Sequence, residues 1–549
     1  MSVLPYALPL GALALSWPML SRRLALSRAK HRSLAGHSRM AKRLARWLPA
    51  YHYDEHEFFR CDGADEGVAQ RRREAFEALS AGFSTRYARS LALTRQAREG
   101  LADLQLTSAY RVPFQFAPLV RQHLPVGAFV ASAQGHTLID LDGNRFIDLT
   151  GSYGVNVMGV DFYKACMAEG LQVAEALGPV LGAYHPCVAG IVERLQDISG
   201  QDEVSFHMSG TEAVMQAVRL ARYHTGRRHL VRFCGAYHGW WDDVQPGPGN
   251  PMPPRETYTL ADISERSLDV LRHRRDIACV LVNPLQALHP NRNAPADSAL
   301  LDSSRRAGFD RQAYADWLQR LRQVCTERRI VLIMDEVFLG FRLAPGGAQA
   351  YFGVQADMVT YGKTIAGGYP VGVLCGRHDL MRRYRDDRPA DLCLARGTFN
   401  AHPYVMAGMS AFLKRLDDPE VLAAYEGQDE RWDARARLFN ETMEREALPM
   451  RAAHLQSIWT IDFTEPSRYN WMLQYYLRWH GVALSWVGTG RLIFSLRMDD
   501  AEFAEVVERF VKAGRDMRRS GWWMNPEGLN DRWIRRRVLR EFLAARFGF

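Results

Sequence analysis

Lys363 is the residue of this chain whose surroundings most favour covalent chemistry. It lies in a glycine-rich segment, T-Y-G-K-T-I-A-G-G at 360–368, directly after a short apolar run. An isolated lysine is usually an exposed surface residue. A lysine confined among apolar and glycine residues has a lowered ammonium pKa, because burial disfavours the charged form. Its free amine is then a nucleophile suited to forming a Schiff base with a carbonyl compound.

Two acidic residues end another apolar run, I-V-L-I-M at 330–334. Asp335 and Glu336 could cap a helix, form salt bridges, bind a metal or act as an acid–base pair. One of the two carboxylates could instead pair with a cationic ring nitrogen. This segment, taken alone, leaves those alternatives open.

The segment S-G-T-E-A at 209–213 follows a third run and opens a predicted helix. A helix N-terminus offers an anion free N–H groups and a positive dipole end, and small residues let the backbone come close. Ser209 and Thr211 add hydroxyl donors, although both residue types are also ordinary helix caps. A phosphate cup, a carboxylate for a ring nitrogen and an imine-forming lysine are what pyridoxal 5′-phosphate (PLP) needs from its protein. Tyr237, after a fourth run, could stack on such a cofactor.

The elements that must position these residues are the strands of a predicted α/β sheet. Between about 160 and 400, short apolar runs alternate with helical windows, which is typical of a mostly parallel sheet with helices on both faces. The runs are V-S-F-H-M at 204–208, H-L-V-R-F-C at 229–234, A-C-V-L-V at 278–282, I-V-L-I-M at 330–334, M-V-T-Y at 358–361 and V-G-V-L-C at 371–375. Ligands of such sheets bind beyond the carboxyl ends of the strands, where the residues above are expected.

The order of several motifs makes the chain similar to a known enzyme family. The motifs are S-G-T-E-A-V-M at 209–215, G-A-Y-H-G at 235–239, D-E-V-F-L-G-F-R at 335–342, G-G-A-Q at 346–349, Y-G-K-T-I-A-G-G-Y-P-V-G at 361–372 and G-T-F at 397–399. Over roughly residues 125–515 they resemble the class III (subgroup II, fold type I) PLP-dependent aminotransferases. Within that group the chain is most similar to the glutamate-1-semialdehyde 2,1-aminomutases. The resemblance implies PLP as cofactor and the fold of a PLP-binding large domain beside a smaller α+β domain.

The resemblance also implies roles for the residues that would hold the cofactor ring. Lys363 would form the Schiff base and carry the proton after the substrate displaces it. Asp335 would pair with the pyridinium nitrogen and keep it protonated. Val337 would pack on one face of the ring, and Tyr237 on the other.

The cofactor phosphate is assigned in the same way. Gly210 and Thr211 would hold it, with Ser209 beside them. Thr398 would reach the phosphate of the neighbouring subunit's cofactor, which implies a homodimer with shared active sites. The family pattern includes no metal, and the chain shows no Cys/His cluster with zinc spacing.

Several segments depart from the family pattern on the substrate side. The aminomutase S-P-V-R segment is absent, and the corresponding region reads R-V-P-F-Q-F at 111–116. The usual E-P-V becomes N-P-L at 283–285, and the usual G-N-P becomes N-A-H-P at 400–403. The family has no counterpart of residues 1–120. Three arginines are candidates for a substrate carboxylate: Arg342, Arg396 and Arg497.

Three functions follow from these observations, in order of preference. The first is an aminotransferase that moves an amino group from a small-molecule donor to an aldehyde or keto acceptor. The second is an aminomutase that moves the group within one substrate. The third, a non-catalytic binding protein with this fold, is disfavoured because Lys363 and Asp335 are both present.

We predict five segments. Residues 166–404 form the PLP-binding large domain, and 121–165 with 405–515 form the small domain. Residues 28–120 form a helical N-terminal extension, which is broken near Gly82 and ends in an extended linker at Pro113 and Pro118. Residues 516–549 form a basic, aromatic tail whose helix presents one apolar face, either docked on the body or in contact with a membrane surface. Its apolar face would consist of Trp533, Ile534, Val538, Leu539 and Phe542.

The basic character of the chain lies at its two ends. The formal net charge is +9, and the first 50 residues contain nine Lys and Arg and no acidic residue. Residues 1–27 include an uncharged run from Val3 to Leu20, which is near the lower length limit of a membrane span. This segment is either a membrane anchor or an apolar arm packed on the enzyme. The arginines after the run would keep the rest of the chain cytoplasmic.

Two further classes of protein are disfavoured. No nucleic-acid motif accompanies the basic charge. The eight cysteines are scattered without a C-x-x-C pair, which indicates free thiols in a reducing compartment. We therefore expect a cytoplasmic enzyme, either free or attached to the cytoplasmic face of a membrane.

Overall fold

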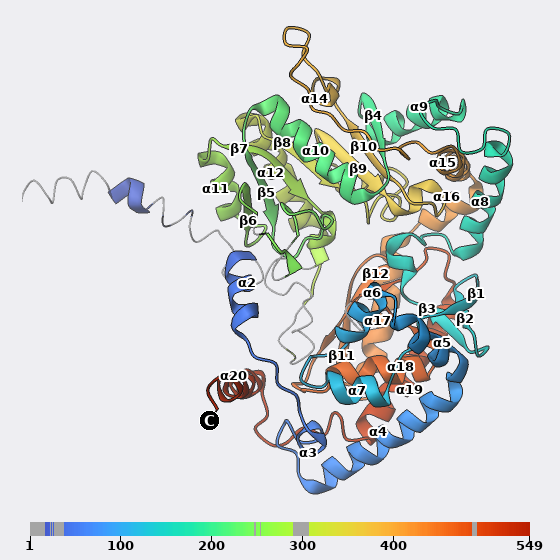
Figure 1. Ribbon diagram of the computed structural model, residues 1–549, viewed down its shortest axis with the longest axis vertical. Helices are drawn as coiled ribbons and strands as arrows, with labels where there is room; N and C mark the ends of the chain where they lie inside the picture. The colour runs from blue at the N-terminus through green and yellow to red at the C-terminus, as the bar shows by residue number, and fades with distance from the viewer. Residues whose placement is uncertain are drawn as a thin grey trace, which may run out of the picture.

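The computed structural model describes residues 17–21, 24, 26, 38–245, 249–252, 254–288, 303, 307–485 and 491–548. The chain forms an α/β large domain around a seven-stranded sheet, and a second lobe of smaller sheets and helices lies beneath it (Figure 1). The predicted fold class is confirmed. Most of the anchor predicted at 1–27 lies outside the described residues, and no helix within the described residues is long and apolar enough to cross a membrane.

The seven-stranded sheet has the order β4-β10-β9-β8-β7-β5-β6. Its strands are β4 (Glu203–His207), β5 (His229–Phe233), β6 (Thr257–Leu260), β7 (Ile277–Val282), β8 (Val331–Asp335), β9 (Met358–Gly362) and β10 (Gly372–Gly376). β10 is antiparallel to both of its neighbours, and the pairs from β9 to β6 are parallel. All six predicted runs are strands. β6 was missed because T-Y-T-L is a short, half-buried edge strand without a continuous apolar run.

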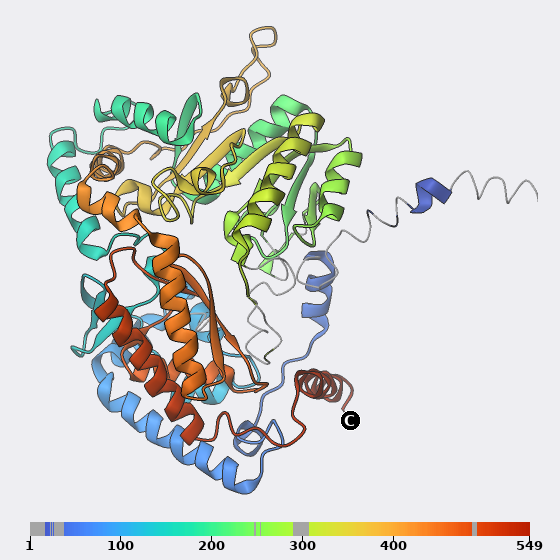
Figure 2. The same cartoon turned by 180° about the vertical axis from the view of Figure 1, so that it is seen from behind.

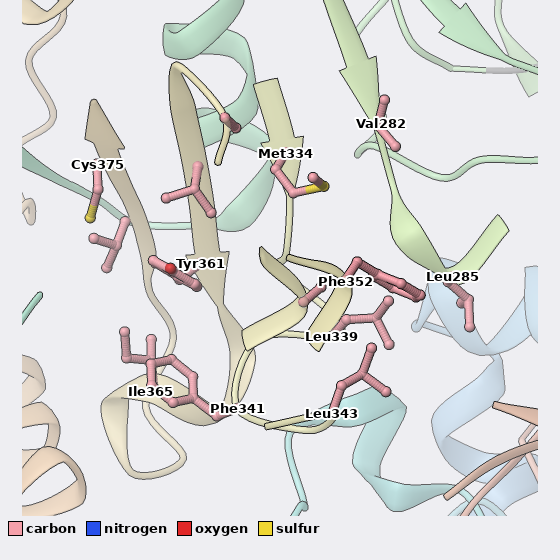
Figure 3. Packing of buried hydrophobic residues seen from close by; sticks show 14 of the residues in the cluster. Val282, Leu285, Met334, Leu339, Phe341, Leu343, Phe352, Tyr361, Ile365 and Cys375 are labelled. Atoms are coloured by element: carbon pink, nitrogen blue, oxygen red, sulfur yellow. The ribbon is translucent and has the colours of Figure 1, made fainter. Parts of the chain in front are cut away.

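The central strands are buried on both faces, so their apolar runs are continuous. Ile333 of β8 packs with Val218 of α10 (Gly210–Thr225) on one face. Its neighbour Met334 points to the other face and packs in a separate cluster with Trp317 of α12 (Arg311–Arg328). Figure 3 shows Met334 in this second cluster with apolar side chains from the loop after β8. Both faces therefore hold the carboxyl ends of β8 and β9 in fixed positions.

Further helices pack around the seven-stranded sheet, and two of them come mostly from the stretch 405–515 that was predicted for the small domain. They are α8 (Val160–Ala174), α9 (Cys187–Ser199), α11 (Glu265–His273), α13 (Gly347–Phe352), α14 (His378–Met381), α15 (Pro403–Arg415) and α16 (Pro419–Tyr425). The short 3-10 segments are η1 (Gly151–Gly154), η3 (Pro284–Leu288) and η5 (Lys363–Ala366). α8 and α15 pack closely, since a Cβ at Gly170 would lie 2.7 Å from the backbone nitrogen of Gly408.

The second lobe contains two small sheets. One has the order β1-β2-β3-β13 and the other β11-β12-β14. Their strands are β1 (Val130–Gln134), β2 (Thr137–Asp140), β3 (Arg145–Asp148), β11 (Met450–Leu455), β12 (Ile458–Phe463), β13 (Val482–Ala483) and β14 (Leu492–Ile493), and the helices beside them are α17 (Gln428–Arg445), η6 (Asn470–Met472), α18 (Leu473–Trp479) and α19 (Asp500–Arg519). The segment D-G-N at 142–144 forms the turn of a hairpin between β2 and β3, which are antiparallel. Gly143 supplies the positive φ of +82° that its turn requires.

The N-terminal extension is helical, with a non-helical segment at Pro113 as predicted, but the predicted break near Gly82 and the linker at Pro118 were wrong. Its helices are α2 (Ser38–Trp47), α3 (Glu55–Phe58), α4 (Glu66–Arg86), α5 (Ala88–Arg98), α6 (Ala102–Ala109) and α7 (Ala117–His123). α4 continues through Gly82, where a Cβ would lie 2.9 Å from the ring of Trp479, so this glycine permits close packing rather than a break. Pro118 does not extend a linker; it lies in the first turn of α7, where proline is tolerated.

The C-terminal tail ends in α20 (Asp531–Phe547), which lies beside α3 and away from the seven-stranded sheet (Figures 1 and 2). Ile534 is buried, and the ring of Phe542 contacts those of Tyr51 and Phe114 at centroid distances of 5.4 and 6.0 Å. The prediction of one apolar face was wrong for Trp533 and Leu539, which are 36% and 57% exposed. The tail is thus docked on the extension.

Candidate functional site

The carboxyl ends of β8 and β9 bring Asp335 and Lys363 to one cavity of about 530 Å³. Asp335 is the last residue of β8 and pairs in register with Thr360 of β9, whose hydroxyl donates to Asp335 Oδ1 at 3.2 Å. Lys363 follows Gly362, the last residue of β9, and has a positive φ of +53°. Lysine rarely adopts this backbone conformation, so the fold holds it there at some cost.

Burial lowers the pKa of Lys363, and Asp335 opposes this shift while Arg342 adds to it. The Nζ atom lies 5.8 Å from the centroid of the Phe338 ring. Lys363 makes no ion pair or hydrogen bond to any residue within the described ranges. Because burial lowers the pKa of Lys363 and no described residue pairs with it, the amine is available to react with a carbonyl group.

Asp335 is held by a residue whose role the sequence did not reveal. His238 Nδ1 and Asp335 Oδ2 are 2.7 Å apart, and both side chains are buried. The backbone N–H of Val337 donates to Asp335 Oδ1 at 3.2 Å. His238 therefore fixes the carboxylate orientation, and its position in the G-A-Y-H-G motif was the available signal.

The predicted phosphate cup has the geometry of a backbone cradle. Ser209 is the N-cap of α10, and its Oγ accepts from the N–H of Glu212 at 3.3 Å. A Cβ at Gly210 would lie 2.5 Å from Val337 Cγ1, and a Cβ at Gly372 would collide with the carbonyl oxygen of Ser209. Gly239 has a φ of +96°, and a Cβ there would lie 2.5 Å from Thr211 Oγ1. Glycines thus keep the helix N-terminus open to an anion.

Tyr237 and Val337 both line the same cavity. Tyr237 is 60% exposed, and its carbonyl oxygen accepts from Asn283 Nδ2 at 3.1 Å. Asn283, one of the departures from the family pattern, therefore anchors the segment that carries the predicted stacking ring. Ser209, Gly210 and the other predicted residues converge on this cavity, with one exception: Thr398 lies in an exposed turn at 398–400 and does not line it.

The three arginines predicted for a substrate carboxylate do not line the cavity. Arg342 is buried and donates to Ser457 Oγ and to the carbonyl oxygens of Asn156 and Phe494 at 2.8–3.1 Å. Arg497 pairs with Glu420 at 2.9 Å, and Arg396 is exposed. Arg491 lines the cavity instead.

Glu336 does not line the cavity, and its side chain stabilises the fold. Its carboxylate accepts from the N–H groups of Ala348 and Gln349 at 2.6 and 2.9 Å, at the start of α13. Burial raises its pKa to about 7. Among the residues that the structure describes, no group of three His, Cys, Asp or Glu side chains could hold a metal ion.

The set of groups in this cavity fits PLP. It contains a cradle of N–H groups for the phosphate, a buried carboxylate for the ring nitrogen, apolar and aromatic side chains for the ring faces and a reactive amine. These are Ser209, Gly210, Thr211, Tyr237, Asp335, Val337 and Lys363.

Filling the cradle is expected to weaken cofactor binding. In Gly210→Ala the new methyl group would crowd Val337, so the apparent Kd for PLP should rise about tenfold or more. Titration of the apoenzyme with PLP, followed by absorbance, measures this change. Gly190→Ala in α9 is the matched control, because a Cβ there meets nothing within 4 Å. Equal PLP affinity in the two variants would contradict the placement of the cradle.

Comparison with known proteins agrees with this geometry. Residues 119–513 match the sequence model of the family described as Aminotransferase class-III. Glutamate-1-semialdehyde 2,1-aminomutases from Desulfotalea psychrophila and Methanococcus maripaludis are 34% and 32% identical over 368 and 364 residues. Each alignment covers 63% of this chain, and they cover 79% and 78% of the two relatives.

Solved structures share the fold. A transaminase with PLP bound is 26% identical, with a TM-score of 0.59, and the match covers 76% of this chain and 99% of that one. A glutamate-1-semialdehyde aminomutase from Pseudomonas aeruginosa PAO1 is 18% identical, with a TM-score of 0.62 and coverage of 82% and 99%. The similarity to the aminomutase structure, at 18% identity, concerns the fold alone.

Proposed function

Because this chain belongs to the class III aminotransferases, which are PLP-dependent enzymes, we propose that its cavity moves an amino group from a donor to an aldehyde or keto acceptor. One observation carries the proposal: the adjacent strands β8 and β9 deliver Asp335 and Lys363 to the same cavity, opposite a glycine cradle. A carboxylate and an unpaired amine in that arrangement suit amine chemistry on a bound aldehyde.

PLP, when bound, supplies an aldehyde that takes up the amino group and a ring that accepts electrons from the substrate. Lys363 would hold the cofactor through its Nζ atom and, once released, would move a proton between the two carbons on either side of the transferred nitrogen. Its lowered pKa favours the free amine that can take up that proton. Asp335, oriented by His238, keeps a negative charge beside the ring nitrogen.

The remaining predicted residues position the cofactor. Ser209, Gly210 and Thr211 hold the phosphate at the N-terminus of α10, and Tyr237 and Val337 enclose the ring. The exposed turn that contains Thr398 supports a further proposal, that it reaches the cofactor phosphate of a second subunit in a homodimer.

An aminomutase is the second candidate, because the relatives named above are glutamate-1-semialdehyde 2,1-aminomutases. An aminomutase needs one substrate that carries both amino positions, whereas a transaminase needs two substrates. The absence of S-P-V-R at 111–116 favours the transaminase.

A two-step screen distinguishes these candidates. The PLP-loaded enzyme is mixed with amino donors, and loss of its visible absorbance identifies a donor; aldehydes and keto acids are then added to restore it. A transaminase requires both partners for turnover. Turnover of a single amino aldehyde without net change in cofactor state would instead identify an aminomutase. A protein that gains no visible absorbance with PLP would contradict both.

A further inference from the structure

A second cavity, of about 270 Å³, lies between the N-terminal extension and the second lobe. It is lined by α5, α6 and α7, by η1 and by α18. Five arginines contribute to its wall, whereas none of the described residues that line it is acidic. The five are Arg95, Arg98, Arg111, Arg121 and Arg478. We call this space the arginine cavity.

Three of these arginines are unpaired: Arg95, Arg98 and Arg111 form no hydrogen bond or ion pair through their side chains with any described residue. Arg121 Nε donates only to the carbonyl oxygen of Ala117, at 3.3 Å. The fully buried Arg72, by contrast, pairs with Asp62 at 2.7 Å.

Arg478 forms the floor of the arginine cavity. Its guanidinium lies 5.4 and 4.9 Å from the ring centroids of Tyr87 and Phe146, and its Nη2 donates to the carbonyl oxygen of Gly127 at 3.3 Å. Its Nε atom is buried without a partner. The aromatic contacts hold a rigid donor in place, and part of its hydrogen-bonding capacity is unused.

No acidic side chain among the described residues lines the cavity, so its positive charge is compensated only in part. Burial lowers the pKa of Arg111, and burial with the neighbouring Arg111 lowers that of Arg478 to about 10. The negative charge of Asp140 raises the pKa of Arg478. The Asp140 carboxylate, however, already accepts hydrogen bonds from the N–H groups of Asp142 and Asn144 at 2.9 Å. Arg111 and Arg478 are partly removed from water, and like charges in that position are unfavourable unless an anion joins them.

We propose that the arginine cavity binds a small molecule through a phosphate group. Several guanidinium groups suit a ligand with two or more negative charges, since phosphate oxygens accept paired, charge-assisted hydrogen bonds from arginine. Arg98 and Arg121 also line an adjoining, more open space of about 430 Å³, which leaves room for the rest of the ligand. This inference goes beyond the proposed function and does not depend on it.

The phosphate has two sources, the acceptor substrate itself or a separate effector. The two cavities share segments: Tyr153 lines the arginine cavity and Val155 lines the catalytic one. A Cβ at Gly154, between them, would lie 3.2 Å from Lys363 Cδ. A ligand in the arginine cavity is therefore placed to act on the catalytic residue.

The test titrates inorganic phosphate and pyrophosphate into the PLP-loaded, full-length enzyme at constant ionic strength, followed by calorimetry. PLP loading keeps the cofactor's own phosphate site filled. We expect saturable binding that is tighter for pyrophosphate, and the double variant Arg98→Gln/Arg121→Gln should weaken it about tenfold or more. Arg437→Gln on α17 is the matched control, because Arg437 is exposed and its side chain makes no hydrogen bond or ion pair with a described residue.

Non-saturable binding, or equal weakening in the control, would overturn the inference. The visible absorbance of each variant reports PLP loading separately, so a loss of anion binding with intact absorbance concerns the arginine cavity alone. Kinetics then identify the source. If added phosphate raises the KM only of a phosphorylated acceptor, the phosphate group in the cavity belongs to the substrate. If added phosphate changes kcat with an unphosphorylated acceptor, the cavity binds a separate effector.

Discussion

Replacing Lys363 by alanine is expected to lower the rate of amino transfer by about 10³-fold or more, because the variant loses both its covalent hold on the cofactor and its proton carrier. The fold should survive, since Lys363 makes no ion pair or hydrogen bond to a described residue and its positive φ already strains the backbone. Steady-state turnover with a donor and acceptor pair measures the loss, and circular dichroism checks the fold.

Lys414→Ala is the matched control for this variant. Its side chain is 78% exposed and its Nζ atom lies 3.5 Å from Glu169 Oε1, so its removal should leave turnover and absorbance unchanged. Added primary amines should partly restore the rate of Lys363→Ala, because a small amine can carry the missing proton. Full activity of Lys363→Ala would contradict the proposed role.

Replacing Asp335 by asparagine is expected to lower kcat by about 10²- to 10³-fold while the cofactor stays bound. The amide is nearly the same size and can still accept from Thr360 and Val337, but it carries no charge to hold a proton on the ring nitrogen. Single-turnover measurements should place the loss in the chemical step. The visible absorbance should persist, since Lys363 and the cradle are intact.

The adjacent acid provides a control with a different outcome. Glu336→Gln removes an acceptor that holds the start of α13, so it should lower the Tm and leave the kcat of the folded enzyme unchanged. If Asp335→Asn lowered only the Tm, and Glu336→Gln lowered kcat, the assignment of the two acids would be reversed.

The residues that sequence alone could place are those whose neighbours in the chain define them. Asp335 ends a strand, Lys363 and the segment 209–213 follow strands, and each belongs to a local motif, so their convergence was expected from the parallel sheet. The role of His238 was missed because its partner, Asp335, is 97 positions away. The G-A-Y-H-G motif points to His238 itself but does not identify Asp335 as its partner.

Long-range packing explains the other differences. Arg342 ends the motif that begins with Asp335, yet its guanidinium donates to the backbone carbonyl oxygens of residues 156 and 494. Only the folded chain brings these two carbonyl groups to Arg342. In the sequence Gly82 predicts a helix break, but in the structure it lets the helix pack closely against the ring of Trp479. The arginine cavity combines residues 95–121 with Arg478, so no segment of the sequence reveals it.

The central claim is that PLP binds to Lys363, and peptide mapping after borohydride reduction tests it most directly. Reduction converts the Schiff base to a stable amine, and trypsin does not cleave after the modified lysine. The predicted result is one peptide spanning residues 343–377 that carries the added mass of the reduced cofactor on Lys363. The label on any other lysine, or no label in a protein that binds PLP, would contradict it.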